Sequence, residues 1–201
     1  MGGDYRLAVA LMNRLKAPQG FGGSRWNHPL VYGRPVLRAW RELGLPPQLI
    51  LSVIRTESAF QAEVVSASNA RGLMQLLPST ALKLAALQGD TNFREDDLFD
   101  PELNVRYGSN YLARLQAAFG SQSLALAAYN GGPFNVQAFM KAHPERPLDL
   151  FVETLPFAES SEYVKRVTES LANYEAAYLG KYGLTDFTQP VGLPKSPPPN
   201  F

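Results

Sequence analysis

One segment restricts the fold of this 201-residue chain more than any other. It begins at Asp100-Pro101, where aspartate suits an N-cap and proline suits a first helical turn, and it ends at Gly120. Between these signals, apolar residues recur at every fourth position. They are Leu103, Tyr107, Tyr111 and Leu115. The pattern predicts a long amphipathic helix that buries one face in a core.

Similar start and stop signals predict helices along most of the remaining chain. The expected helices are 35–44, one that opens at Pro46-Pro47 and carries Glu57, one that begins at Pro78, 123–129, one that ends near His143, and one around 164–178. Residues 62–77 lack clean periodicity and are predicted to form a packed loop. The expected fold class is therefore all-α, with at most a minor hairpin.

The two ends of the chain differ in composition from its middle. Residues 1–34 are expected to form a helical annex and linker, with a short helix over 5–16 and a Gly- and Pro-rich connection. Residues 35–183 are expected to form the main domain. Residues 184–201 are rich in proline and predict a polyproline-like tail.

Composition excludes several function classes. The 19 Lys and Arg residues balance 18 Asp and Glu residues, and no basic run occurs, which argues against nucleic-acid binding. The chain has no cysteine, which excludes disulfides, thiol catalysis and cysteine metal sites. Its two histidines, His28 and His143, lack zinc-binding spacing and are expected on the surface or in loops. No signal peptide, membrane-spanning stretch or phosphate-binding loop is recognisable.

Glu57 interrupts the apolar face of its predicted helix. Ile50, Val53 and Ile54 precede it at spacings that place all four residues on one stripe. A carboxyl group on such a stripe loses water, which favours its neutral form and should raise its pKa above about 4.3. A neutral glutamic acid can donate a proton in catalysis. The alternative is a frayed helix end that leaves this side chain in water.

Four short motifs occur in a specific order around and after this glutamate. Residues 57–60 read Glu-Ser-Ala-Phe, 70–75 read Ala-Arg-Gly-Leu-Met-Gln, 128–133 read Ala-Tyr-Asn-Gly-Gly-Pro, and 151–157 with 163–167 read Phe-Val-Glu-Thr-Leu-Pro-Phe and Tyr-Val-Lys-Arg-Val. In this order and spacing, the chain resembles the soluble lytic transglycosylases over roughly residues 35 to 180. The resemblance implies a lysozyme-like helical catalytic domain.

The resemblance also implies an activity, with peptidoglycan glycan strands as the substrate. Members of this family cleave the β-1,4 bond between N-acetylmuramic acid and N-acetylglucosamine without water, and they leave a 1,6-anhydromuramyl end. The substrate's own N-acetyl group is thought to stabilise the intermediate, which departs from the usual two-carboxylate scheme. No metal or organic cofactor is implied.

Carried over by position, the resemblance makes Glu57 the sole catalytic acid and base. It implies substrate contacts at Ser58, Gln75, Leu77, Tyr129, Asn130 and Glu153. The residues themselves leave structural alternatives open. Ser58 could hydrogen-bond its own helix, Gln75 could satisfy loop backbone, and Tyr129 could be a core residue before a helix stop. Glu153 could be a second buried carboxyl or a helix-end charge with a basic partner.

Three positions depart from the family pattern. Asn69 stands where glycine is common, and asparagine also tolerates left-handed backbone geometry. Leu77 stands where some members have methionine, a conservative change for an apolar contact to sugar. Ser161 stands where many members have arginine, and this puts contacts to the acidic stem peptide, or a structural ion pair, in doubt.

The resemblance places the enzyme in the periplasm or cell envelope. We expect a monomer without an integral membrane segment, and the chain could be the catalytic portion of a longer multidomain protein. Two other functions remain open. One is a muramidase-type hydrolase of the goose-lysozyme kind, and the other is a peptidoglycan-binding module without turnover.

Overall fold

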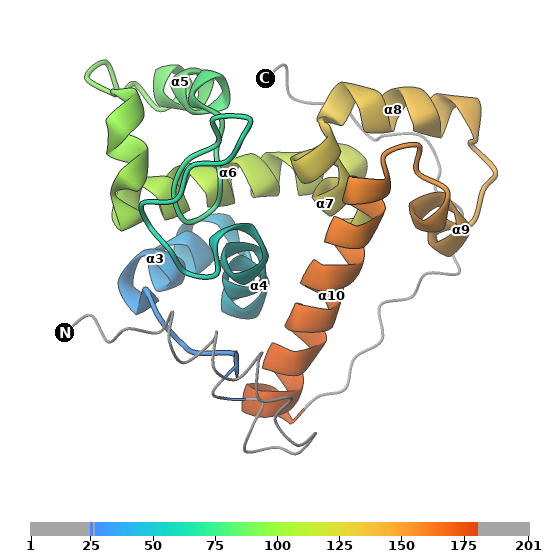
Figure 1. Cartoon of the computed structure of the whole chain (residues 1–201), viewed down its shortest axis with the longest axis horizontal. Helices are drawn as coiled ribbons and strands as arrows, with labels where there is room; N and C mark the ends of the chain where they lie inside the picture. The colour runs from blue at the N-terminus through green and yellow to red at the C-terminus, as the bar shows by residue number, and fades with distance from the viewer. Residues whose placement is uncertain (1–24, 26, 181–201) are drawn as a thin grey trace. The chain divides into compact units, whose positions relative to one another are not determined.

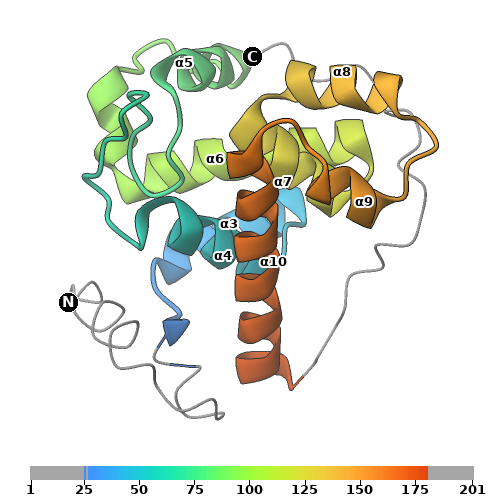
Figure 2. The same cartoon turned by 45° about the vertical axis from the view of Figure 1, so that its right-hand side comes forward.

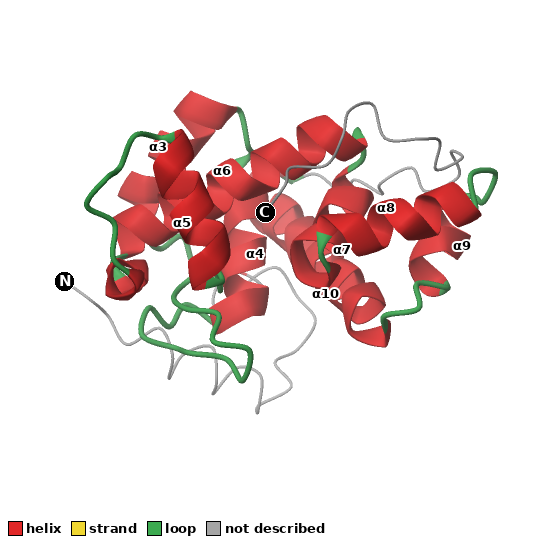
Figure 3. Cartoon of the chain, turned by 90° about the horizontal axis from the view of Figure 1, so that it is seen from above, coloured by secondary structure: helices red, strands yellow, loops and turns green. Residues whose placement is uncertain are grey.

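The computed structural model describes residue 25 and residues 27–180, which form helices joined by loops (Figure 1). The helices are α3 (Gly33–Leu43), α4 (Pro47–Ser58), α5 (Pro78–Leu87), the 3₁₀ helix η1 (Glu95–Phe99), α6 (Pro101–Phe119), α7 (Gln122–Gly131), α8 (Pro133–Ala142), α9 (Leu148–Glu153) and α10 (Ala158–Leu179). Figure 3 shows no strand among these residues. The extended pairing among the described residues consists of two isolated bridges, Val65 with Arg71 and Arg71 with Leu76. The all-α prediction is confirmed.

Helix α6 confirms the prediction made from Asp100-Pro101. The Asp100 carboxylate accepts a hydrogen bond from the Leu103 N–H at 2.8 Å, which satisfies one of the donors that a helix start leaves open. At the other end, Gly120 has φ 66° and its N–H bonds to the Gln116 carbonyl. The buried face is wider than predicted, because Leu112 is fully buried beside Tyr111.

The other predicted helices are also present, with boundaries shifted by a few residues. Two short elements were not predicted, α9 and η1. Helix α9 has six residues, and η1 has five that begin with three acidic side chains, so neither is long enough to show an apolar period. The predictions for residues 5–16 and for the tail over 184–201 fall outside the described residues.

The chain divides into two compact units. Among the described residues, the first unit contains 25, 27–109 and 169–180, and the second contains 110–168. Within the first unit α3 packs against α4, and α5 packs against η1 (Figure 1). Within the second unit α7 packs against both α8 and α9 (Figure 2).

The first unit joins its earliest described residues to the end of α10. The Tyr174 hydroxyl donates to the Pro29 carbonyl at 3.0 Å, and the Tyr178 hydroxyl donates to the His28 carbonyl at 2.9 Å. His28 lies in a loop, which is one of the two locations expected for it. It is only 5% exposed, because its ring packs edge-on against Tyr174 with centroids 4.9 Å apart.

None of the helices described combines the length and apolar character needed to cross a lipid bilayer.

Candidate active site

Helix α4 positions Glu57 one residue before the end of the helix. Pro47 occupies the first turn, where its missing N–H is not needed. Ile50, Val53 and Ile54, which share the stripe with Glu57, are fully buried. Glu57 itself is half-buried and lies within the helix, so a frayed end does not describe it. Its carboxyl is therefore attached to a helix that the core holds in place.

The chain leaves α4 after Ser58 through a turn with an uncommon backbone conformation. Ala59 and Phe60 have φ values of 48° and 66°, the left-handed region that residues other than glycine seldom adopt. The Ala59 N–H bonds to the Arg55 carbonyl, and the Tyr32 hydroxyl donates to the Phe60 carbonyl at 3.0 Å. Such strain persists only where surrounding contacts support it, and it is frequent at active sites.

Ser58, a predicted substrate contact, is 5% exposed. Its hydroxyl donates to the Ile54 carbonyl at 3.0 Å, four residues earlier. This is the bond that a helix-internal serine commonly makes. The structure therefore shows the local alternative for this hydroxyl, and its contact with substrate stays a prediction.

The predicted packed loop over residues 62–77 is held by Asn104, which lies in the second turn of α6. The fully buried Asn104 accepts a bond from the Met74 N–H at 2.8 Å. Its amide nitrogen donates to the Arg71 carbonyl at 2.9 Å and to the Leu98 carbonyl at 2.8 Å. One side chain thus bonds to three backbone groups, two in the loop and one in η1, and ties the loop to both η1 and α6.

Asn104 was missed by the sequence reasoning. Its one available signal was that asparagine is a poor helix former and yet stands inside the predicted helix. Gly72 lies directly against the Leu98 carbonyl and the Asn104 side chain. A Cβ added there would lie 2.1 Å from the Leu98 carbonyl oxygen, and Gly72 has φ +77°. Only glycine meets both requirements without displacing the loop.

Gln75 and Leu77 lie at the end of this loop. Gln75 has φ 45°, and its amide nitrogen donates to the Val64 carbonyl at 3.1 Å and the Gly72 carbonyl at 2.9 Å. The structure shows the loop-backbone alternative for this nitrogen. Leu77 precedes α5 and is 41% exposed, which leaves an apolar side chain available to a ligand. Asn69 has φ 63°, the left-handed geometry expected for it.

Tyr129 and Asn130 lie in the last turn of α7, in the second unit. The Tyr129 ring packs at 5.2 Å from the ring of Tyr111 on α6, and burial raises the pKa of Tyr111 to about 12. Asn130 accepts a hydrogen bond from the buried Ser160 hydroxyl at 2.7 Å. A Cβ on Gly131 would lie 2.5 Å from that same Ser160 oxygen. The helix end carrying both predicted contacts is therefore fixed against the start of α10.

Glu153 ends α9 and points to a basic partner. Its side chain is 58% exposed and lies 2.8 Å from Lys165 Nζ on α10. Of the two alternatives, the structure shows the helix-end charge. The hydrogen bond to Glu153 raises the pKa of Lys165. Ser161, where many family members have arginine, is only 6% exposed.

The structure thus distributes the predicted site residues over both units. Glu57, Ser58, Gln75 and Leu77 belong to the first unit, and Tyr129, Asn130 and Glu153 belong to the second. Residues 25 and 27–180 contain no group of three or more His, Asp or Glu side chains arranged to hold a metal ion.

Comparison with known proteins gives consistent matches. The soluble lytic murein transglycosylase of Escherichia coli K12 is 34% identical over 167 residues, which cover 78% of this chain and 25% of the relative. The chain therefore spans about a quarter of that relative's length. Among solved structures, an inactive mutant of lytic transglycosylase Slt from Pseudomonas aeruginosa has a TM-score of 0.75 at 29% identity, over 94% of this chain and 31% of that one.

A second structure, the 70-kDa soluble lytic transglycosylase in complex with bulgecin A, has a TM-score of 0.79 at 26% identity. It covers 92% of this chain and 32% of that one. Residues 35–151 match the family model described as the transglycosylase SLT domain, and they include the first three motifs and the start of the fourth. Together with the helical fold, these matches show that the chain belongs to the transglycosylase SLT domain family.

Proposed function

We propose that this chain is a peptidoglycan lytic transglycosylase, with residues 35–183 as its catalytic domain. It cleaves the β-1,4 bond between N-acetylmuramic acid and N-acetylglucosamine without water and leaves 1,6-anhydromuramyl ends. The observation that carries this proposal is the half-buried carboxyl of Glu57 at the end of a helix anchored in the core, within the residues that match the family.

The chemistry assigned to Glu57 has two proton transfers. The protonated carboxyl first donates to the glycosidic oxygen, which leaves with its electron pair. The resulting carboxylate then accepts the proton of the muramyl C6 hydroxyl as that oxygen attacks C1. One group can serve both steps because the second transfer restores the proton lost in the first. Such acid–base catalysis typically contributes about 10² to 10⁴ in rate.

Relatives support this assignment. The Escherichia coli relative is named a soluble lytic murein transglycosylase. The inactive form of the Pseudomonas aeruginosa relative differs by replacement of a glutamate with glutamine. We further propose that Ser58, Gln75, Leu77, Tyr129, Asn130 and Glu153 contact the glycan, and that the protein acts as a monomer in the cell envelope.

The test is mass spectrometry of purified peptidoglycan digested with wild type, Glu57→Gln and Glu63→Gln. Glu63 is an exposed glutamate in the following loop and serves as a matched control. We expect anhydromuramyl products from wild type and from Glu63→Gln, and none from Glu57→Gln. Reducing muramyl ends would instead identify a hydrolase. Undiminished cleavage by Glu57→Gln would refute its assigned role.

A further inference from the structure

Arg146 lies in the loop between α8 and α9 and bonds to a residue at the end of each helix. Its Nη1 donates to the Thr154 hydroxyl oxygen at 2.6 Å, and its Nη2 lies 3.2 Å from His143 Nδ1. Because a guanidinium group has only donors, His143 Nδ1 is the acceptor of the second bond. His143 is the C-cap of α8, and Thr154 is the C-cap of α9. We call these three residues the α8–α9 clamp.

Aromatic rings connect the clamp to the core of the second unit. The Arg146 guanidinium lies 5.5 Å from the centre of the Phe139 ring, which is within the range of a cation–π contact. The Phe139 ring packs edge-on against His143 at 4.6 Å and lies 4.9 Å from the ring of Phe151, a fully buried residue of α9. A planar guanidinium with two directed bonds and a ring beside it is held in one orientation.

The clamp ends one residue after Glu153. The N–H and the hydroxyl of Thr154 both donate to the Leu150 carbonyl, which closes the last turn of α9. The same hydroxyl oxygen accepts the bond from Arg146. A helix of six residues is too short to be stable without tertiary contacts. The contacts that hold this last turn therefore also set the direction of Glu153.

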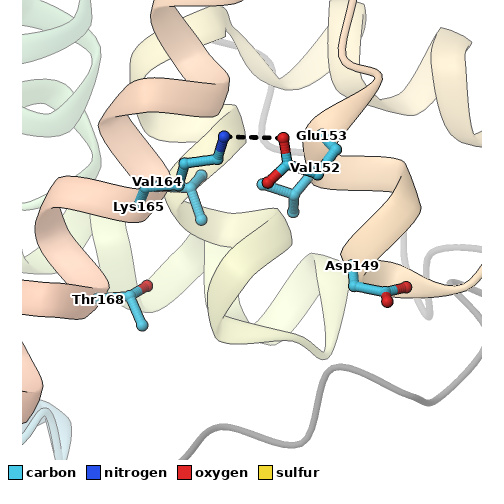
Figure 4. A pocket seen from close by; sticks show the side chains of 6 residues that line it. All are labelled: Asp149, Val152, Glu153, Val164, Lys165 and Thr168. Atoms are coloured by element: carbon cyan, nitrogen blue, oxygen red, sulfur yellow. Dashed lines mark hydrogen bonds and ion pairs between the residues drawn. The ribbon is translucent and has the colours of Figure 1, made fainter.

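The ion pair of Glu153 with Lys165 gives less support than the clamp. Figure 4 shows Glu153 on α9 turned toward Lys165 on α10, beside a cavity of about 310 Å³ that Val152 and Val164 also line. The two charged side chains are 58% and 41% exposed, and exposed ion pairs contribute little. The pair alone is therefore too weak to keep the Glu153 carboxylate in one place.

We propose that Arg146 is a positioning residue for substrate binding. Through Thr154 it holds the last turn of α9, so that Glu153 presents its carboxylate to the glycan in one orientation. Arg146 itself does not contact the glycan. The inference rests on the proposed function, because it needs the glycan contact assigned there to Glu153. It adds a residue that lies outside the four motifs.

The first test is a double-mutant cycle with Glu153, measured as KM on peptidoglycan. Arg146→Met keeps an unbranched side chain beside Phe139 and removes the charge and both hydrogen bonds. We expect KM to rise about fivefold, which corresponds to the net value of one hydrogen bond, with kcat changed by less than about twofold. In a Glu153→Gln background the same change should alter KM by less than about twofold, because the carboxylate that Arg146 positions is gone.

Thr154 and Arg114 provide matched controls. Thr154→Val removes the acceptor of the Arg146 bond and should raise KM as Arg146→Met does, whereas Thr154→Ser keeps the hydroxyl and should match wild type. Arg114 is an exposed arginine of the same unit that bonds within its own helix, to Asn110 on α6 at 2.7 Å. Arg114→Met should leave KM unchanged.

Hydrogen exchange tests the clamp without any need for activity. Mass spectrometry should show faster amide exchange over residues 148–154 in Arg146→Met than in wild type, because the last turn of α9 opens more often. Exchange over residues 110–119 of α6 should not change.

Three results would overturn the inference. The first is an unchanged KM in Arg146→Met. The second is an equal rise of KM in the wild-type and Glu153→Gln backgrounds. The third is unchanged exchange over residues 148–154. If wild type makes no anhydromuramyl products, the proposed function fails, and the exchange measurement still decides whether Arg146 holds α9.

Discussion

Two glutamates, Glu57 and Glu153, lie at similar places on their helices and in different surroundings. Each is within the last two residues of a helix, α4 or α9. Glu57 is half-buried on a helix whose apolar face is fully buried, whereas the Glu153 side chain is 58% exposed and paired with Lys165. The two carboxyls therefore differ in burial and in the partner that each one meets.

The contacts around the two glutamates also differ, in burial and in kind. The loop that follows Glu57 is held by the buried side chain of Asn104, which bonds to the backbone of Met74 and Arg71. Glu153 depends on a solvent-exposed ion pair. Buried hydrogen bonds resist salt and are costly to break, whereas exposed ion pairs contribute little and are screened.

The largest effect on activity should come from Glu57→Gln, and the same exchange at Glu153 serves as the comparison. We expect Glu57→Gln to lower kcat by about 10² to 10⁴ or more, because it removes the proton donor with little change of shape. Glu153→Gln should change KM with a much smaller effect on kcat, because its role is contact rather than proton transfer. Steady-state kinetics on peptidoglycan measures both. Equal losses of kcat would remove the distinction between the two carboxyls.

The second-largest effect should come from removing Asn104, whose side chain holds the loop after Glu57. Asn104→Ala removes three hydrogen bonds and leaves buried backbone groups unpaired, so we expect the free energy of unfolding to fall by about 3 kcal/mol. Urea titration followed by circular dichroism gives this value. Asn92→Ala, on an exposed loop residue, should change it by less than about 0.5 kcal/mol. A similar small change for Asn104→Ala would show that the loop is held by other contacts.

The second unit, which contains Glu153, also contains a buried tyrosine, Tyr111. Burial raises the pKa of Tyr111 from 10.0 to about 12, so folding favours its neutral phenol. The stabilisation is complete below the unfolded pKa and is lost as pH rises from 10.0 toward about 12.

The Tyr111→Phe variant lacks the phenol hydroxyl and therefore cannot ionise at this position. Its loss of stability across this window should therefore be smaller than that of wild type by about 2 to 3 kcal/mol. Urea titrations on either side of the window give the difference. Identical pH dependence in the two proteins would contradict the raised pKa of Tyr111.

The smallest effect on stability should come from removing the ion pair between Lys165 and Glu153 in the second unit. Lys165→Met removes the partner of Glu153 and Glu162, whose side chains are 58% and 65% exposed. We expect little or no change in the free energy of unfolding, and none at high salt, because water already solvates these charges. Thermal melts at low and high salt check this. A large loss at high salt would mean that the pair supports the second unit in the way that Asn104 supports the first.

Much of the fold was predictable from local sequence signals. Asp100-Pro101 and Gly120 delimit α6, and Pro47 and Pro78 open α4 and α5, as predicted. These signals act within one or two helical turns, so a single sequence contains all that they need. The short helix α9 was missed because six residues cannot show a helical period.

The candidate site was predictable as a set of positions but not as a set of contacts. The motif order identified Glu57 and the six predicted glycan contacts, and their roles in binding and catalysis remain predictions. The motifs did not indicate that the Gln75 amide nitrogen bonds to Val64 and Gly72, or that Asn130 accepts a bond from Ser160. Residues 130 and 160 are far apart in sequence, and nothing local couples them.

The sequence by itself determined most of the helices and the family, and it predicted Glu57 as the key carboxyl, because capping, periodicity and ordered motifs are properties of neighbouring residues. Only the tertiary structure decided which buried polar groups find hydrogen-bond partners. Asn104 finds partners up to 33 residues away, whereas the buried hydroxyl of Thr168 finds none among the described residues. That difference depends on how helices and loops pack, which residue order alone does not specify.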